Sequence, residues 1–131
     1  MRKEGIINAE LVYSLAALEH TDLCVIGDAG LPVPKGVKLI DLAFTRGTPG
    51  FAEVLRAVAQ EMTIESYVVA KETGEKNPEN NLVISETLAG YPHETVTHEE
   101  LKKLTEKAKF IIRTGEVTPY SNVILVSSAG F

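Results

Sequence analysis

The chain has 131 residues, 44% of them hydrophobic and 24% charged, which is the balance of an ordinary globular domain with one core. Lys and Arg total 13 against 18 Asp and Glu, and the net charge of −5 without any basic run argues against a nucleic-acid-binding protein. No apolar run approaches the roughly 20 residues of a membrane span, and we expect neither a signal peptide nor a membrane segment, hence a cytoplasmic protein.

Helical and strand patterns alternate through the first half of the chain. The predicted elements are a helix over residues 9–19, a strand over 23–27, a strand over 37–44, and a helix that follows a Thr48-Pro49 cap and ends near Glu61. The strand over 23–27 is apolar throughout, which is typical of a sheet covered on both faces. It contains the one cysteine, Cys24, which we expect to be a buried apolar residue rather than a reactive thiol.

The second half continues the alternation. Its predicted elements are a strand over 64–70, a polar loop over 71–76, a helix from the Asn77-Pro78 pair to Gly90, a helix after Thr97, and strands over 110–113 and 122–126. Thr97 and Glu100 match a capping box, which fixes His98 at the first helical position. Without any internal repeat or linker, the sequence predicts one layered α/β domain over residues 1–131, with a mostly parallel or mixed sheet flanked by helices.

Two polar side chains flank the strand over 23–27. His20 precedes it, and Asp28 follows it, at the end where open α/β sheets bind ligands. At about 3.3 Å per residue, eight extended residues would separate the two by about 25 Å, so they share a site only if the chain bends or another subunit supplies one of them. Taken singly, each is also an ordinary residue of a helix end or of a turn.

Tyr120 and Asn122 form the most suggestive pair, because an aromatic ring suits the C–H face of a sugar and an amide both donates to and accepts from hydroxyls. Lys102 and Lys103 follow His98 on the predicted helix, and we expect either to be able to reach a polar ligand near the helix start. The simpler interpretation is that His98 is an ordinary residue of a helix start and that the lysines are solvated. Pro-Tyr turns such as the one at residues 119–120 are common, so the spacing of Tyr120 and Asn122 alone does not establish a carbohydrate-binding site.

Metal and phosphate sites lack their usual spacing. No His-x-x-x-His or Cys-x-x-Cys pair links the candidate metal ligands, and we expect no metal. Those candidates are His20, Asp22, Asp28 and His98. The Gly-Asp-Ala-Gly stretch at residues 27–30 lacks the Gly-x-Gly-x-x-Gly and Gly-Lys-Ser/Thr patterns of phosphate loops.

Residues 19–34 read EHTDLCVIGDAGLPVP, and residues 108–122 read AKFIIRTGEVTPYSN. These stretches resemble the D-ribose pyranase family, the RbsD side of the RbsD/FucU group of sugar mutarotases. That family has GHTD, a short apolar run and DAGLPxP in the first stretch, and AxxxIRTGExTPYAN in the second. Glu19 replaces a glycine and Ser121 an alanine. The shorter stretches THEELKKLT and GIINAEL also fit, whereas residues 71–96 match loosely and the last six residues differ.

The resemblance implies a cofactor-free isomerase that interconverts β-D-ribopyranose and β-D-ribofuranose. It implies that His20 is the catalytic proton donor and that the sugar contacts Asp28, His98 and the segment Tyr120-Ser121-Asn122. It also implies a closed ring of subunits, commonly a homodecamer, with each site shared between neighbours. A non-catalytic ribose-binding module of a sugar-uptake system, a fucose-type mutarotase and a metal-dependent hydrolase remain as alternatives.

Overall fold

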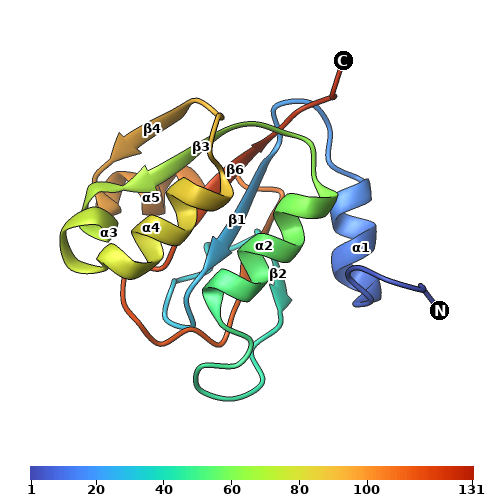
Figure 1. Ribbon diagram of the computed structural model, residues 1–131, viewed down its shortest axis with the longest axis horizontal. Coiled ribbons are helices and arrows are strands. Elements are labelled where there is room, and N and C mark those ends of the chain that lie inside the picture. Colours follow the sequence, from blue (N-terminus) through green and yellow to red (C-terminus); the bar gives the residue numbers. More distant parts are fainter.

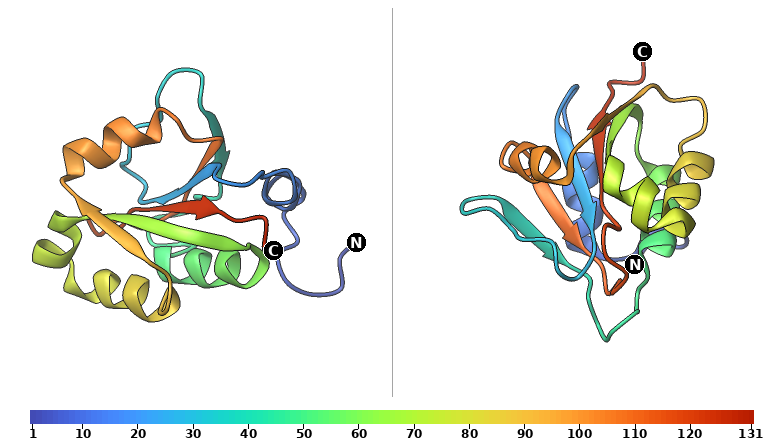
Figure 2. Two further views of the ribbon diagram at one scale, coloured as in Figure 1. Left: turned by 90° about the horizontal axis from the view of Figure 1, so that it is seen from above. Right: turned by 90° about the vertical axis from the view of Figure 1, so that its left-hand side faces the viewer.

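One six-stranded mixed sheet with helices on both faces organises the computed structural model, which describes residues 1–131 (Figures 1 and 2). The helices are α1 (Ala9–Ala16), α2 (Phe51–Glu61), α3 (Lys71–Lys76), α4 (Pro78–Thr87) and α5 (His98–Thr105). The strands are β1 (Leu23–Gly27), β2 (Lys38–Asp41), β3 (Ile64–Ala70), β4 (His93–Val96), β5 (Phe110–Arg113) and β6 (Val123–Ser127). The predicted α/β class with a layered mixed sheet is confirmed.

The strand order β2-β5-β1-β6-β3-β4 decides where a site can form. β6 runs antiparallel to β1 and β3, whereas the other pairings are parallel. The carboxyl ends of β2, β5 and β1 therefore meet at one end of the sheet, beside the amino end of β6. Because β1 lies between β5 and β6, the connection from 114 to 122 crosses over the end of β1. Ligands of open α/β sheets bind at such an end.

Each face of the sheet has its own apolar core. One face packs against α1, α2 and α4, where Phe51, Leu55 and Ile84 are almost completely buried. The other face packs against α5, which contributes the fully buried Leu101. Burying a side chain of this size stabilises the fold by about 1.5–3 kcal/mol. Cys24 is completely buried, and burial raises the pKa of its thiol, so the predicted apolar role is confirmed.

Several elements have the predicted bounds, among them the strands over 23–27, 64–70 and 110–113. The capping box is present as well. The Thr97 hydroxyl oxygen accepts the N–H of Glu100 at 3.1 Å, and the Glu100 carboxylate accepts the N–H of Thr97 at 3.3 Å. His98 therefore occupies the first position of α5, as predicted.

The ends of three early elements differ from the prediction. α1 stops at Ala16, since residues 17–22 form turns in which the Asp22 carboxylate accepts the N–H of Glu19 at 2.8 Å. β2 covers only four of the eight residues predicted. α2 begins at Phe51 rather than at Pro49, because residues 45–48 form a turn of their own and Gly50 is the N-cap residue.

Two elements were not predicted. Residues 71–76 form α3 rather than a loop, and the only buried residue of this polar helix is Thr73. Residues 93–96 form β4, an edge strand that pairs with β3 and is largely exposed. His93, the first residue of β4, stacks on the Tyr67 ring with 4.8 Å between ring centroids. No helix is long and apolar enough to cross a membrane.

Candidate active site

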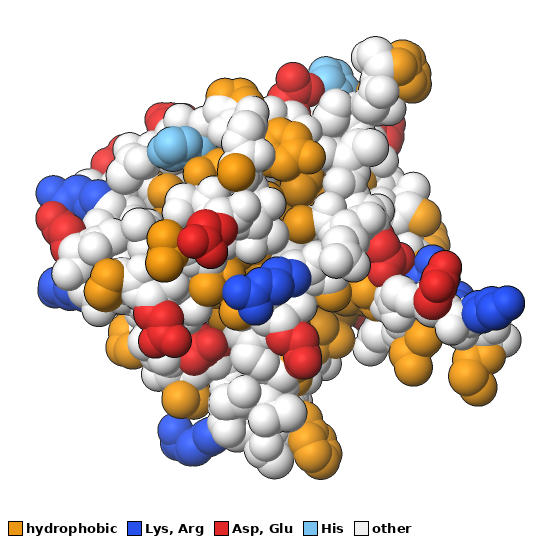
Figure 3. All heavy atoms as spheres, in the orientation of Figure 1, with side chains coloured by type: hydrophobic (Ala, Val, Ile, Leu, Met, Phe, Trp, Pro, Cys, Tyr) orange, Lys and Arg blue, Asp and Glu red, His pale blue; other side chains and the backbone are white.

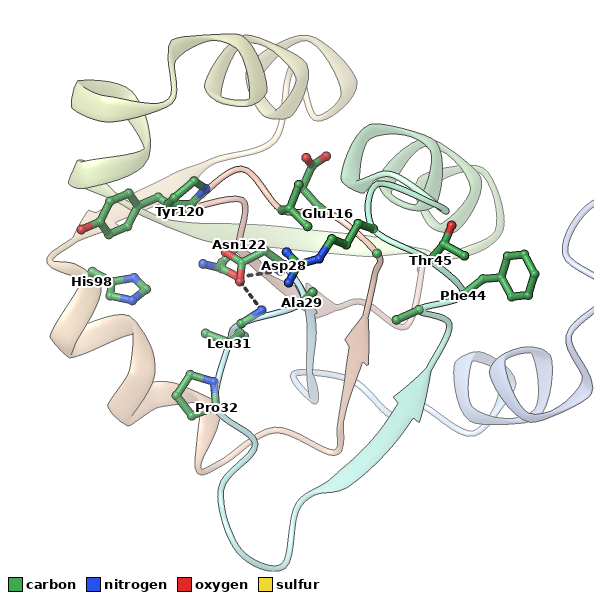
Figure 4. A pocket seen from close by; sticks show the side chains of 16 residues that line it. Asp28, Ala29, Leu31, Pro32, Phe44, Thr45, His98, Glu116, Tyr120 and Asn122 are labelled. Atoms are coloured by element: carbon green, nitrogen blue, oxygen red, sulfur yellow. Dashed lines mark hydrogen bonds between the residues drawn. The ribbon is translucent and has the colours of Figure 1, made fainter.

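A pocket of about 690 Å³ lies at the end of the sheet that the topology selects (Figure 4). Three segments that are distant in sequence line it, together with His98 at the start of α5. They are residues 28–32 after β1, residues 43–46 after β2, and five residues of the 115–120 connection after β5 with Asn122 just before β6. The pocket therefore brings together four of the residues predicted for the site, namely Asp28, His98, Tyr120 and Asn122.

Asp28 and Asn122 meet at the back of the pocket. The side-chain oxygen of Asn122 accepts the backbone N–H of Asp28 at 3.0 Å, and Asn122 is almost completely buried. One oxygen of the Asp28 carboxylate accepts the N–H of Gly30 at 2.9 Å, which closes a tight turn after β1. These contacts fix the position of Asp28 in the pocket lining.

Burial raises the pKa of the Asp28 carboxyl above its ordinary value. Hydrogen bonds from the Gly30 N–H, the Asn122 amide and the Ser121 N–H act in the opposite direction, as does the nearby His98, but burial outweighs them. A carboxyl with a raised pKa next to a pocket is suited to accept, or to exchange a proton with, a ligand hydroxyl.

His98 and Tyr120 form one wall of the pocket (Figure 4). Their rings meet edge to face, with 5.0 Å between centroids and planes at 89°. The Nδ1 atom of His98 is buried and has no hydrogen-bond partner. Buried polar atoms are seldom left unpaired, which sets this nitrogen apart from the other polar atoms around the pocket.

Three predicted site residues lie elsewhere in a single chain. His20 lies beyond the amino end of β1, away from the pocket, where its Nδ1 accepts the N–H of Ala129 at 3.2 Å and lies 3.6 Å from a carboxylate oxygen of Glu65. The Ser121 side chain is buried behind the pocket. Lys102 pairs with Glu99 at 2.8 Å and lines a separate shallow groove.

Two parts of the pocket wall were not predicted. Glu116 accepts hydrogen bonds from the N–H of Phe51 at 3.1 Å and from the hydroxyl of Thr118 at 2.9 Å, and Figure 4 shows its carboxylate pointing away from Asp28. Residues 43–46 form the opposite wall and carry the exposed Phe44. Both parts lie outside the helices and strands, so no periodic pattern of apolar residues predicts them. The only sequence signal for Glu116 is its place in the Gly115-Glu116 pair of the second family motif.

A Cβ atom on Gly115 would lie 2.3 Å from the carbonyl oxygen of Thr48, which explains how the loop after β2 approaches the strand-end residues. The N–H of Gly47 donates to the Gly115 carbonyl at 2.6 Å and the N–H of Gly115 to the Pro49 carbonyl at 2.8 Å. The close backbone approach thus holds residues 43–46 over the pocket. No group of three or more His, Cys, Asp or Glu side chains is arranged to hold a metal ion.

Sequence comparison places the chain among known proteins. The model of the RbsD / FucU transport protein family matches residues 1–129. The chain is 47% identical to a D-ribose pyranase of Bacillus velezensis over 131 residues, which is the full length of both. It is 52% identical to a D-ribose pyranase of Bacillus cereus strain G9842 over 125 residues, which is 95% of each chain.

Solved structures agree in fold. The structure of Bacillus subtilis RbsD complexed with D-ribose matches with a TM-score of 0.96 and 45% identity over the whole of both chains. A fucose mutarotase from Streptococcus pneumoniae in complex with L-fucose matches with a TM-score of 0.80 and 22% identity over 94% of each chain, which shows the shared fold alone. With a family match over residues 1–129 and full-length relatives near 50% identity, this chain belongs to the RbsD/FucU family.

Proposed function

We propose that this protein is a D-ribose pyranase, an isomerase that interconverts β-D-ribopyranose and β-D-ribofuranose, and that it acts in the cytoplasm. The observation that carries the proposal is the convergence of Asp28, His98, Tyr120 and Asn122 in one pocket, in a chain that matches a ribose-bound relative with a TM-score of 0.96. A pocket of about 690 Å³ accommodates a pentose.

The reaction needs only proton transfers. A base removes the proton of the anomeric hydroxyl while an acid protonates the ring oxygen, and the hemiacetal C–O bond breaks to give the open aldehyde. A different hydroxyl then adds to the aldehyde carbon, losing its proton as the carbonyl oxygen gains one. Positioned acid–base groups accelerate such steps by about 10²–10⁴-fold. No redox step or phosphate is involved, so titratable and amide side chains are chemically sufficient for the reaction.

The pocket residues have complementary roles in this proposal. The Asp28 carboxyl and the imidazole of His98 bind sugar hydroxyls. The Tyr120 ring covers a C–H face, and the Asn122 amide links the sugar site to Asp28. Ser121 contributes through its backbone N–H, which contacts the Asp28 carboxylate, rather than through its hydroxyl.

His20 is the proposed proton donor and reaches the pocket from a neighbouring subunit. Because the N–H of Ala129 donates to its Nδ1, the neutral ring carries its proton on Nε2, which is then the donor atom. His20 and the pocket lie at opposite ends of β1, which is the arrangement expected when each site combines two subunits of a closed ring. We propose a homo-oligomer, most simply a decamer.

Exposed apolar side chains support assembly. Figure 3 shows hydrophobic side chains projecting from the loop after β2 and from both ends of the chain. Phe44 and Val117, both on the pocket wall, are 82% and 51% exposed, and Phe131 near His20 is fully exposed. Large exposed apolar groups beside a pocket mark surfaces that are covered by another protein chain.

A non-catalytic ribose-binding module would use the same pocket contacts, so turnover must be measured. The deciding experiment is NMR magnetisation exchange on equilibrated D-ribose with catalytic amounts of protein. Exchange between the pyranose and furanose anomeric signals is the expected result. Exchange only between α and β forms of one ring size would instead identify a mutarotase, and broadening of ribose signals without exchange would identify the binding module.

A further inference from the structure

Polar side chains at the junction of α3 and α4 form hydrogen bonds to the chain segment behind the pocket, residues 119–121. This α3–α4 corner consists of Thr73, Lys76, Asn77 and Asn80, and it contacts residues 119–121. We propose that Asn77 is a positioning residue of the sugar site, whose amide holds the 118–121 turn in the conformation that aims Tyr120 into the pocket. The inference rests on the proposed function, because it concerns how the same pocket is kept in shape.

The backbone of Tyr120 needs external support. Its φ of +64° lies in the left-handed region, which residues with a side chain seldom adopt. Such a conformation persists when the surroundings fix it on several sides. The Asn77 amide donates to the Pro119 carbonyl at 2.9 Å, and the Thr73 hydroxyl donates to the Tyr120 carbonyl at 2.8 Å. The peptide groups on both sides of the Tyr120 Cα are thus held from the corner.

Two side chains contact the Tyr120 ring. The ammonium group of Lys76 lies 5.6 Å from the centre of the Tyr120 ring, and His98 meets that ring on the pocket wall. The backbone N–H of His98 in turn donates to the carboxylate of Glu72 at 3.0 Å, and Glu72 belongs to α3. One short helix therefore supports both Tyr120 and His98.

Ser121 joins the corner to the turn. Its hydroxyl accepts hydrogen bonds from the amides of Asn77 and Asn80, each at 2.8 Å, and donates to the Thr118 carbonyl at 2.8 Å. One donor and two acceptor positions are the whole capacity of a hydroxyl. Asn77, Asn80 and Ser121 are 3%, 8% and 0% exposed, so water does not replace a lost partner.

The two ends of the Asn77 amide act separately. Its oxygen accepts the N–H of Asn80 at 3.2 Å and thereby caps α4, whereas its nitrogen donates to Pro119 and Ser121.

Asn77→Asp keeps a good capping oxygen and loses both donors. Asn77→Ser also keeps a capping oxygen, and its one short hydroxyl donor does not replace the two N–H donors of the amide. Because it adds no charge, it guards against misfolding caused by a buried carboxylate. Asn81→Asp is the matched control, since Asn81 follows on the same helix and its side chain makes no hydrogen bond.

The experiment compares wild type, Asn77→Asp, Asn77→Ser and Asn81→Asp in two measurements on the full-length protein. Hydrogen exchange followed by mass spectrometry reports on peptides that cover residues 115–122 and 78–87. NMR exchange kinetics with D-ribose give kcat and KM. For both Asn77 variants we expect faster exchange in 115–122, unchanged exchange in α4, and a loss in kcat/KM of about ten- to hundred-fold, as small misplacements of site groups cause. Asn81→Asp should resemble wild type.

Three results would overturn the inference: unchanged exchange in 115–122, a loosened turn with wild-type kcat/KM, or equal losses in Asn81→Asp. A general loss of structure would show as faster exchange in α4 as well, and would count against separate roles for the two amide ends. A wild-type protein that does not interconvert the ring forms would refute the proposed function instead. The positioning would then be judged by whether Asn77→Asp and Asn77→Ser expose 115–122 while leaving α4 protected.

Discussion

The side-chain oxygen of Asn122 accepts the backbone N–H of Asp28 at 3.0 Å and so joins the end of β1 to the start of β6, 94 residues apart. Gly27 makes this approach possible, because a Cβ atom there would lie 3.0 Å from that oxygen and 2.6 Å from the side chain of Leu31. The backbone of Asp28 is therefore fixed, and its carboxyl, whose pKa burial raises, is one of the groups of the site that respond to pH.

Asp28→Asn should raise stability at pH 7 while lowering activity by about a hundredfold or more, since the carboxylate that accepts a sugar hydroxyl is replaced by an amide that cannot take up its proton. Burial raises the pKa of Asp28, so the folded protein binds this proton more tightly than the unfolded chain. The ionised carboxylate then lowers stability increasingly as the pH rises from the unfolded value of about 3.9 through the raised folded value. Thermal unfolding of variant and wild type should differ more at pH 7 than at pH 3.5. An equal difference at both pH values would contradict this account.

Glu116→Gln should have the opposite pH dependence. Burial acts to raise the pKa of Glu116, but hydrogen bonds from the Phe51 N–H, from Thr118 and from the Asn80 side chain outweigh it and lower the pKa. The ionised group therefore stabilises the fold above its unfolded value of about 4.3, and this contribution is lost as the pH falls through the lowered folded value.

We expect Glu116→Gln to lower the unfolding midpoint by a few degrees at pH 7 and to differ less from wild type at pH 3. Thermal unfolding at both pH values measures it. Glu86→Gln is the control, because the exposed side chain of Glu86 makes no hydrogen bond, and its midpoint should stay close to wild type. If the difference in unfolding midpoint between Glu116→Gln and wild type were larger at pH 3 than at pH 7, the hydrogen bonds of Glu116 would not favour its ionised form.

Gly115→Ala should destabilise the protein by about 1–3 kcal/mol, the usual effect of forcing an extra carbon into a packed site. Its Cβ would lie 2.3 Å from the Thr48 carbonyl oxygen and 2.7 Å from that of Thr45, and both are backbone atoms that cannot rotate away. Gly30→Ala is the control, because its Cβ would meet only the Asp28 carboxylate at 3.5 Å. Urea unfolding of the two variants measures the difference, and equal midpoints would show that the loop after β2 yields easily.

Local signals in the sequence predicted most of the fold. The strand over 23–27 has no polar residue to expose, and the Thr97 capping box fixes a helix start from four residues alone. α3 could not be predicted this way, because its residues are polar and its one buried side chain, Thr73, finds its partner 47 residues away at Tyr120. β4 is an exposed edge strand and lacks the apolar alternation that predicts strands.

The site was predictable where motif residues sit at strand ends, as Asp28 and Asn122 do. Spacing did not show that Ser121 faces away from the pocket while its neighbours Tyr120 and Asn122 line it, since the direction depends on the left-handed turn at Tyr120. The loop over 43–46 carries no periodic pattern, and only the tertiary contact at Gly115 brings it to the site.

His20→Ala should lower the rate of ribose ring exchange by about 10²–10⁴-fold, the usual contribution of a positioned general acid. Its fold should be retained, because the His20 side chain is 56% exposed and its one hydrogen bond is to the N–H of Ala129 near the chain end. NMR exchange with D-ribose measures the rate, and light scattering checks that the variant assembles as wild type does. Wild-type turnover in a correctly assembled variant would remove His20 from the mechanism.

Mixing two inactive variants tests whether neighbouring subunits share each site. His20 and Asp28 lie at opposite ends of β1 in one chain, so a site that uses both must take them from two chains. His20→Ala and Asp28→Asn are each expected to be nearly inactive.

When the two variants are unfolded and reassembled together in equal amounts, about a quarter of the interfaces pair an intact His20 with an intact Asp28, as random assembly of a symmetric ring requires. Ring exchange should recover to about that fraction of wild type, whereas separately reassembled variants stay inactive. No recovery in mixed assemblies of normal size would mean that one chain supplies the whole site, and His20 would then have no route to the sugar.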